Sequence, residues 1–122
     1  MTLTDRDRRR LAGVHPDLVR VVERAASMID EPFFVVLEGL RTEARQRELL
    51  AAGASRTMRS RHLTGHAVDL GAVVGGEVRW DWPLYNRLAE VVKGAAELER
   101  VKVEWGGDWP RFRDGPHWQL PW

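Results

Sequence analysis

The sequence has no cysteine among its 122 residues. This absence excludes disulfide bonds, thiolate zinc sites and a cysteine nucleophile, so any site for a soft metal must use histidine and carboxylate ligands. Long hydrophobic runs are also missing, and apolar stretches such as residues 33–37 are far shorter than the ~20 residues that span a bilayer. We therefore expect no insertion into a membrane.

Neither sign of charge dominates the composition: the sequence has 19 Lys and Arg residues and 18 Asp and Glu residues, which gives a formal net charge of +1. General nucleic-acid-binding proteins usually carry a clear basic excess, so we do not expect a nucleic acid as partner. Residues 1–10 are strongly charged, and no apolar segment of a secretory signal follows them. The protein is therefore expected to be made in the cytoplasm without a signal peptide.

The length and the share of hydrophobic residues, 43%, fit one folded unit, so we expect residues 1–122 to form a single domain. Apolar residues at helical spacing predict helices over 16–28 and 83–98, each with a proline at its start. Shorter helices are expected over residues 4–11 and 43–52.

Short segments rich in β-branched and aromatic residues, or with alternating polarity, predict the strands. They cover residues 33–37, 67–70, 77–80, 101–105 and 117–120. The polar, glycine-containing segments 54–66 and 108–116 are expected to be loops. This order of elements predicts an α+β fold, in which helices pack against a small, mostly antiparallel sheet.

Histidines and acidic residues in two short segments could hold a metal ion. A catalytic zinc ion commonly takes three protein ligands and keeps one position for water. Two imidazoles and one carboxylate, from His62, His117 and Asp69, would meet that need. A second carboxylate must then accept the proton of the water, and Asp114 lies three residues before His117. The residues alone also allow a plainer interpretation, in which His62 and Asp69 share a surface hydrogen bond and His117 is an ordinary strand residue.

Weaker candidates surround these positions. His66 follows His62 at the spacing of paired zinc histidines on a helix, but the Thr64-Gly65 step disfavours a helix there. We therefore expect His66 at the rim of the site or in solvent. Asp108 and Glu104 are alternative proton acceptors.

The segment 60–69 resembles the S-x-H-x-x-G-x-A-x-D signature of the VanY-like D-alanyl-D-alanine carboxypeptidases and phage L-alanyl-D-glutamate peptidases, which are zinc peptidases. His117-Trp118 matches the C-terminal histidine–aromatic pair of that family. Residues 39–46 resemble its G-x-R-x-x-x-x-Q element, and 105–109 resemble a tryptophan–glycine segment of its phage members. The resemblance implies a Hedgehog/DD-peptidase-like fold with the zinc site in a cleft on the sheet.

The resemblance also implies roles for individual residues. Asp114 would be the catalytic base, and Arg41 would stabilise the substrate carbonyl oxygen as it becomes negatively charged. Ser60 is implied as a hydrogen-bonding partner of the site, and Gln46 would either hold Arg41 in place or touch the substrate. The implied ligands of one Zn²⁺ ion are His62, Asp69 and His117.

The function that the resemblance implies is hydrolysis of peptidoglycan stem peptides, at the L-alanyl–D-glutamate bond, by a monomeric phage or prophage endolysin. Aspartate at position 114, where carboxypeptidases of the family usually have glutamate, favours an endolysin. Such an enzyme would reach the wall through a pore, and we expect no separate cell-wall-binding domain. The alternatives are a D-alanyl-D-alanine carboxypeptidase and a catalytically inactive, zinc-stabilised wall-binding module.

Two further features lie close to the expected site. Arg56, Arg59 and Arg61 precede His62, and although such a stretch is usually a solvated loop, it could attract the carboxylates of stem peptides. Trp118 follows His117 on the expected last strand, so its side chain should point to the opposite face and belong to the core.

Overall fold

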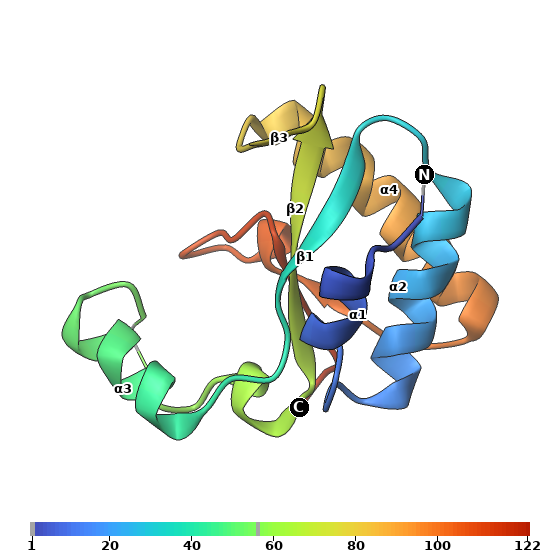
Figure 1. Ribbon diagram of the computed structural model, residues 1–122. Helices are drawn as coiled ribbons and strands as arrows, with labels where there is room; N and C mark the ends of the chain where they lie inside the picture. The colour runs from blue at the N-terminus through green and yellow to red at the C-terminus, as the bar shows by residue number, and fades with distance from the viewer. Residues whose placement is uncertain (1, 56) are drawn as a thin grey trace.

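The computed structural model describes residues 2–55 and 57–122, and it confirms the expected α+β fold with a small antiparallel sheet packed by helices (Figure 1). Arg56 lies outside the described residues. The helices are α1 (Asp5–Arg10), α2 (Pro16–Met28), α3 (Glu43–Ala51), α4 (Trp82–Glu99) and the 3₁₀-helices η1 (Arg61–Thr64) and η2 (Gly106–Asp108). The strands are β1 (Phe33–Glu38), β2 (Ala67–Val74), β3 (Glu77–Arg79), β4 (Glu104–Trp105) and β5 (His117–Gln119).

The long strand β2 is the centre of the sheet, whose order is β1-β2-β5-β4, with β3 paired to the far end of β2. Every pairing is antiparallel. The register places Asp69 of β2 opposite Glu38 of β1 and also opposite His117 of β5, and it places Glu104 opposite Gln119. Polar residues from four strands are thereby aligned at one end of the sheet.

Alternation along the strands separates the core from the site. Val68 and Leu70 of β2 are fully buried in a hydrophobic cluster that runs from Leu3 to Trp118. Because successive side chains of a strand point to opposite faces, Asp69 points away from that cluster. The same rule puts Trp118 in the core, where it is 1% exposed.

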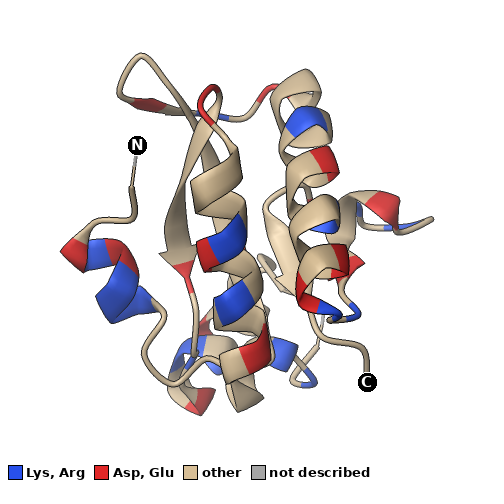
Figure 2. Ribbon diagram, turned by 90° about the vertical axis from the view of Figure 1, so that its right-hand side faces the viewer, with Lys and Arg blue, Asp and Glu red and all other residues tan. Residues whose placement is uncertain are grey.

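Helices α2 and α4 cover the core face of the sheet, while α3 lies on its other side (Figure 1). The apolar face of α2, formed by Leu18, Val21, Val22 and Ala25, is buried. Figure 2 looks onto this helical layer and shows positive and negative residues interspersed along it. The predicted stripe of apolar residues therefore drives the packing of the helices on the sheet.

Local signals in the sequence explain where helices begin. Pro16 occupies the first turn of α2, and the ring nitrogen Nδ1 of His15 accepts a hydrogen bond from the Asp17 N–H. Thr42 caps α3 by accepting a hydrogen bond from the Arg45 N–H at 3.1 Å. His15 thus caps the start of α2.

The structure corrects several expected element boundaries. The expected loop 54–66 contains η1, because Ser60 accepts a hydrogen bond from the His62 N–H and caps a short helical turn. Only the last two residues of the expected strand 101–105 pair with β5. The reason is the end of α4, where Arg100 has a left-handed φ of 57° and the Val101 N–H bonds back to Ala96. The expected strand 67–70 continues to residue 74, because β1 and β3 both pair with its second half.

Among the described residues, no helix combines the length and the apolar composition that crossing a membrane requires.

Candidate metal centre

His62 reaches the site from η1 and is only 2% exposed. Its ring nitrogen Nδ1 lies 2.8 Å from the carbonyl oxygen of Gly39, to which it can only donate a hydrogen bond. In a neutral ring this leaves a lone pair on the other nitrogen, Nε2, which lies 3.2 Å from Oδ1 of Asp69. The backbone carbonyl of Gly39 therefore orients the lone pair of His62 Nε2 towards Asp69, as a metal ligand would require.

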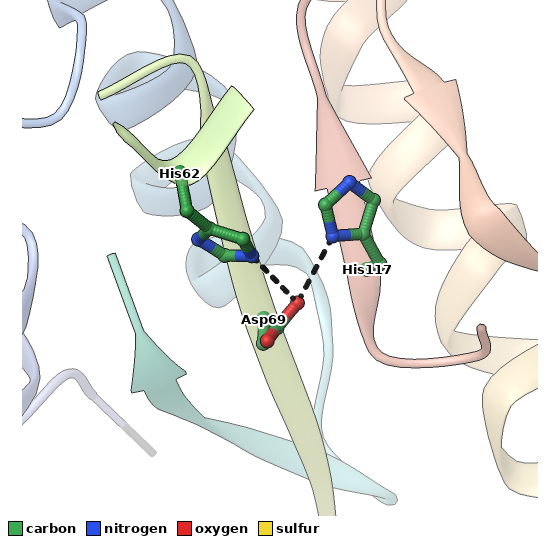
Figure 3. Close-up of side chains that lie close together, drawn as sticks. All are labelled: His62, Asp69 and His117. Atoms are coloured by element: carbon green, nitrogen blue, oxygen red, sulfur yellow. Dashed lines mark hydrogen bonds and ion pairs between the residues drawn. The ribbon is translucent and has the colours of Figure 1, made fainter. Parts of the chain in front are cut away.

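His117 reaches the site from β5 and directs Nδ1 to Asp69, whereas His62 directs Nε2. Nδ1 of His117 lies 3.2 Å from the same Oδ1 of Asp69, and Nε2 of the same ring lies 2.8 Å from Oε1 of Gln119. Figure 3 shows the two imidazole rings directed at Asp69 from two sides. The two histidines thus meet on one carboxylate, which the strand register holds between them.

Gln119 and Glu104 fix the orientation of His117. Nε2 of Gln119 donates a hydrogen bond to Oε2 of Glu104 at 3.1 Å. A carboxylate only accepts, so the amide must turn its NH₂ group to Glu104 and its oxygen to His117. His117 must then donate from Nε2, which leaves the lone pair on Nδ1.

Sequence reasoning did not identify Gln119, and it considered Glu104 only as a proton acceptor. The available signal was alternation, because Gln119 lies two residues after His117 and therefore shares its face of β5. The partner of Gln119 depends on the strand register, which the sequence alone does not reveal.

The charges of the site favour an ionised carboxylate. Burial opposes ionisation of Asp69, but hydrogen bonds from His117 and His62 outweigh it and hold the pKa of Asp69 well below its usual range. Burial likewise opposes the charged form of His117, but the hydrogen bond and charge of Asp69 prevail, so the pKa of His117 is raised. The site therefore attracts positive charge.

The arrangement of His62, Asp69 and His117 fits a metal ion. Their ligand atoms all lie within 4.8 Å of one another. The other nitrogen of each ring already donates a hydrogen bond, so Nε2 of His62 and Nδ1 of His117 each direct a lone pair at Oδ1 of Asp69. Three electron-rich atoms therefore lie together. Only positive charge between them, from bound protons or from a metal ion, can stabilise this arrangement. Two imidazoles and one carboxylate are a donor set that suits zinc. The plainer interpretation, a hydrogen bond at the surface, does not match the burial of both histidines.

The candidate metal centre faces a cavity of about 550 Å³. Its walls include all three candidate ligands and two further residues that the sequence suggested, Arg41 and Asp114. The ring of Trp109 lies 5.1 Å from the ring of His117 and forms part of the wall. Six sequence-predicted residues therefore line one cavity, whereas Gln46 does not: the six are Arg41, Ser60, His62, Asp69, Asp114 and His117.

Arg41 is held by three neighbours in a half-buried position. Its Nε and Nη2 bind the two carboxylate oxygens of Glu38 at 2.6 and 2.9 Å, and its Nη1 binds Oε1 of Gln46 at 2.7 Å. A longer contact of 3.5 Å joins Nη1 to Oγ of Ser60. Sequence reasoning missed Glu38, which neutralises Arg41 and fixes the plane of its guanidinium group.

Gln46 is fully buried on α3. Besides accepting from Arg41, its Nε2 donates to Oγ of Ser55 at 2.7 Å and to the carbonyl oxygen of Thr57 at 2.6 Å. With its amide surrounded in this way, Gln46 supports Arg41 and the following loop and is not available to a substrate.

Asp114 is half-buried in the cavity wall, where its backbone N–H donates to Gly106 at 3.0 Å. Burial and the negative charge of Asp69 raise the pKa of Asp114. Gly106 is required here, because a Cβ atom would collide with the Asp114 backbone and lie 3.1 Å from Cβ of His117. The glycine thus lets η2 lie directly against the segment that carries Asp114 and His117.

The weaker candidates lie elsewhere or have other partners. Asp108 is exposed, pairs with Lys93 at 2.7 Å and does not line the cavity. His66 directs Nδ1 to Oγ1 of Thr64, 2.7 Å away, and its ring lies 5.3 Å from that of His15.

The fold and the donor set together define an α+β protein with a candidate His–Asp–His metal centre. A sequence model of the phage L-alanyl-D-glutamate peptidase family matches residues 1–118, so the chain belongs to this family. The family resemblance of the sequence motifs is thereby confirmed.

Individual relatives agree with this assignment. The L-alanyl-D-glutamate peptidase of Listeria phage A118 is 41% identical over 86 residues, which are 70% of this chain and 30% of that protein. The chain thus spans less than a third of that relative. The L-alanyl-D-glutamate peptidase of Escherichia phage T5 is 29% identical over 106 residues, 83% of this chain and 76% of that protein. The crystal structure of the Serratia marcescens L-Ala D-Glu endopeptidase ChiX matches with a TM-score of 0.92 and 50% identity, and the match covers 99% of this chain and 90% of that one.

Proposed function

We propose that this protein is a zinc-dependent peptidoglycan peptidase that hydrolyses the L-alanyl–D-glutamate bond of stem peptides. The observation that carries the proposal is the convergence of His62 and His117 on one oxygen of Asp69, in a cavity that also contains Asp114 and Arg41. Membership in the peptidase family and the names of its relatives support the choice of substrate.

In this proposal Nε2 of His62, a carboxylate oxygen of Asp69 and Nδ1 of His117 hold one zinc ion. Zinc in such a site supplies Lewis acidity, which polarises a carbonyl group and lowers the pKa of water towards ~7. Gly39 and the Gln119–Glu104 pair keep the two rings in the tautomers that binding requires.

Asp114 is the proposed general base. Its carboxylate accepts a proton from the attacking water and passes it to the nitrogen of D-glutamate as the C–N bond breaks. A raised pKa suits this role, because a carboxylate of ordinary acidity holds a proton too weakly near neutral pH.

Arg41 is the proposed partner of the carbonyl oxygen. A guanidinium group has five N–H donors, and the neighbours named above occupy four of them, which leaves one on Nη2 for the substrate. Its fixed positive charge favours the developing oxyanion over the neutral carbonyl. Glu38, Gln46 and Ser60 hold Arg41 in place before the substrate arrives.

We further propose that the active unit is a monomer with a single domain, since one chain supplies every residue of the site and one core runs through it. Its proposed place of action is the cell wall, as a phage or prophage endolysin that reaches the wall through a pore.

The test is product identification by mass spectrometry after incubating the zinc-loaded protein with purified muropeptides. We expect a new amino terminus at D-glutamate. Release of a single terminal alanine would instead assign the D-alanyl-D-alanine carboxypeptidase activity. Zinc binding with a thermal shift but without any cleavage would assign the inactive wall-binding module.

A further inference from the structure

The cavity of the metal centre is also lined by Arg59, Arg61 and Trp122, which we call the basic rim. The positive charge of Arg41 in this cavity is neutralised by Glu38. In contrast, neither Arg59 nor Arg61 forms an ion pair with a carboxylate of the described residues. The rim therefore presents two uncompensated positive charges to whatever enters the cavity.

Neutral contacts hold these charges in place. Nε and Nη2 of Arg61 donate hydrogen bonds to the carbonyl oxygens of Leu120 and Pro121, at 3.2 and 3.0 Å. The guanidinium carbon of Arg61 lies 4.5 Å from the centre of the Trp122 ring, and that of Arg59 lies 5.0 Å from it. Carbonyl groups and an aromatic face position a guanidinium group without cancelling its charge, so N–H groups of both arginines remain available to an anion.

The chemistry of the proposed substrate supplies such an anion next to the scissile bond. Glutamate has two carboxyl groups, and a peptide chain can continue through only one of them. When the amino group of glutamate is joined to alanine and the peptide continues through one of its carboxyl groups, the second carboxyl group stays a free carboxylate. This carboxylate belongs to the same residue whose nitrogen leaves when the bond breaks. Arg61 directly precedes His62 in the sequence, which places the rim beside the metal centre.

We infer that the basic rim binds the free carboxylate of D-glutamate on the leaving-group side of the scissile bond. This inference rests on the proposed function. It assigns a recognition role to Arg59 and Arg61, with Trp122 as the aromatic support that keeps the two guanidinium groups together. Because Arg59 and Trp122 are exposed and Arg61 is only half-buried, the contribution of the rim should weaken as salt screens the charges.

The experiment compares two synthetic stem peptides that differ only in this group: in one the unlinked group of D-glutamate is a carboxylate, in the other a carboxamide. For the zinc-loaded wild type we expect kcat/KM to be about tenfold higher for the carboxylate, with the difference mainly in KM. Arg59→Gln and Arg61→Gln should each reduce this preference about threefold, and the double variant should abolish it. Arg87→Gln is the control, because Arg87 is exposed on α4 and does not line the cavity.

Calorimetric titration of both peptides, at low and high salt, provides a second measurement that does not need turnover. Equal affinity of the wild type for the two peptides, or a preference that survives in the double variant, would overturn the inference. A preference in binding without cleavage of either peptide would leave the inference standing and overturn the proposed function instead.

Discussion

The metal centre and the basic rim belong to the same cavity but are built in different ways. The candidate ligands Asp69 and His117 lie on paired strands. His62 and His117 are 2% and 6% exposed, and each ring donates a hydrogen bond to its own acceptor, Gly39 for His62 and Gln119 for His117. Trp122 of the rim, in the segment after β5, is 66% exposed, and its partners Arg59 and Arg61 come from a loop and from η1.

This difference indicates what each region can do. Chemistry at an ion requires ligand atoms fixed to a fraction of an ångström, which paired strands and buried hydrogen bonds provide. Attraction of a carboxylate needs only positive charge at the wall of the cavity, which the exposed Arg59 and the half-buried Arg61 provide. Substitutions in the metal centre should therefore have large effects that resist salt, whereas those in the rim should have small effects that salt removes.

The largest effect is expected for His117→Ala, which removes a ligand from the centre. The remaining two side chains cannot complete the donor set, so stoichiometric zinc and peptidase activity should both be lost. Elemental analysis of the dialysed protein and a muropeptide assay measure the two losses. A variant that keeps one tightly bound zinc ion per chain would show that His117 is not a ligand.

Asp114→Asn should separate catalysis from metal binding. The amide keeps the shape of the side chain but cannot accept a proton, so we expect kcat to fall about 10²- to 10⁴-fold. Zinc content should stay at the wild-type level, because Asp114 is not among the proposed ligands. Full activity in this variant would assign the base to another residue, and loss of zinc would place Asp114 inside the metal centre.

Glu104→Gln tests whether the hydrogen bond from Gln119 to Glu104, which fixes the orientation of His117, contributes to zinc binding. Without the carboxylate, the amide of Gln119 can rotate and turn its NH₂ group to His117, which then carries its proton on Nδ1 and cannot bind the ion. We expect zinc affinity to fall about 10- to 100-fold. Competition with a chelator measures the affinity, and ¹⁵N chemical shifts of the metal-free protein report the tautomer.

The control for this prediction is Glu97→Gln, a change of the same charge at an exposed position of α4. It should leave zinc affinity and the tautomer of His117 unchanged. If Glu104→Gln matched this control in both measurements, the hydrogen bond from Gln119 to Glu104 would have no part in metal binding.

Gln46→Leu probes the link between the two regions, because Gln46 joins Arg41 of the site to the loop that leads to the rim. Leucine fills a similar volume but removes the 2.6 Å hydrogen bond to the carbonyl oxygen of Thr57, which keeps only the one from Oγ of Ser55. It also leaves Nη1 of Arg41 with only its longer contact to Ser60. We expect a loss of about 2 kcal/mol in the free energy of unfolding. Urea denaturation measures it, and Arg47→Gln on the exposed face of α3 should change it by less than ~0.5 kcal/mol. A loss as small as that of the control would mean that water replaces these hydrogen bonds.

The sequence alone indicated the fold class, most helices and strands, and the three residues that the structure brings together as a candidate metal centre. Helices such as α2 could be predicted because their apolar residues recur at a fixed spacing and their caps lie next to them in the chain. The candidate ligands could be proposed because their short motifs resemble those of a known family of zinc peptidases, and the structure brings these three residues together.

Tertiary structure decided everything that depends on which residues face one another across the sheet. The pairing of Glu104 with Gln119, and of Glu38 with Asp69, follows from strand register, which is set by packing over the whole core. The Glu38–Arg41 ion pair, in contrast, joins residues only three positions apart. The orientation of His117 follows from the pairing of Glu104 with Gln119, and the position of the rim follows from the distant contacts of Arg59 and Arg61 with Trp122. Local sequence carries the identity of such groups but not their partners, because hydrogen bonds and ion pairs form between residues that only the folded chain brings together.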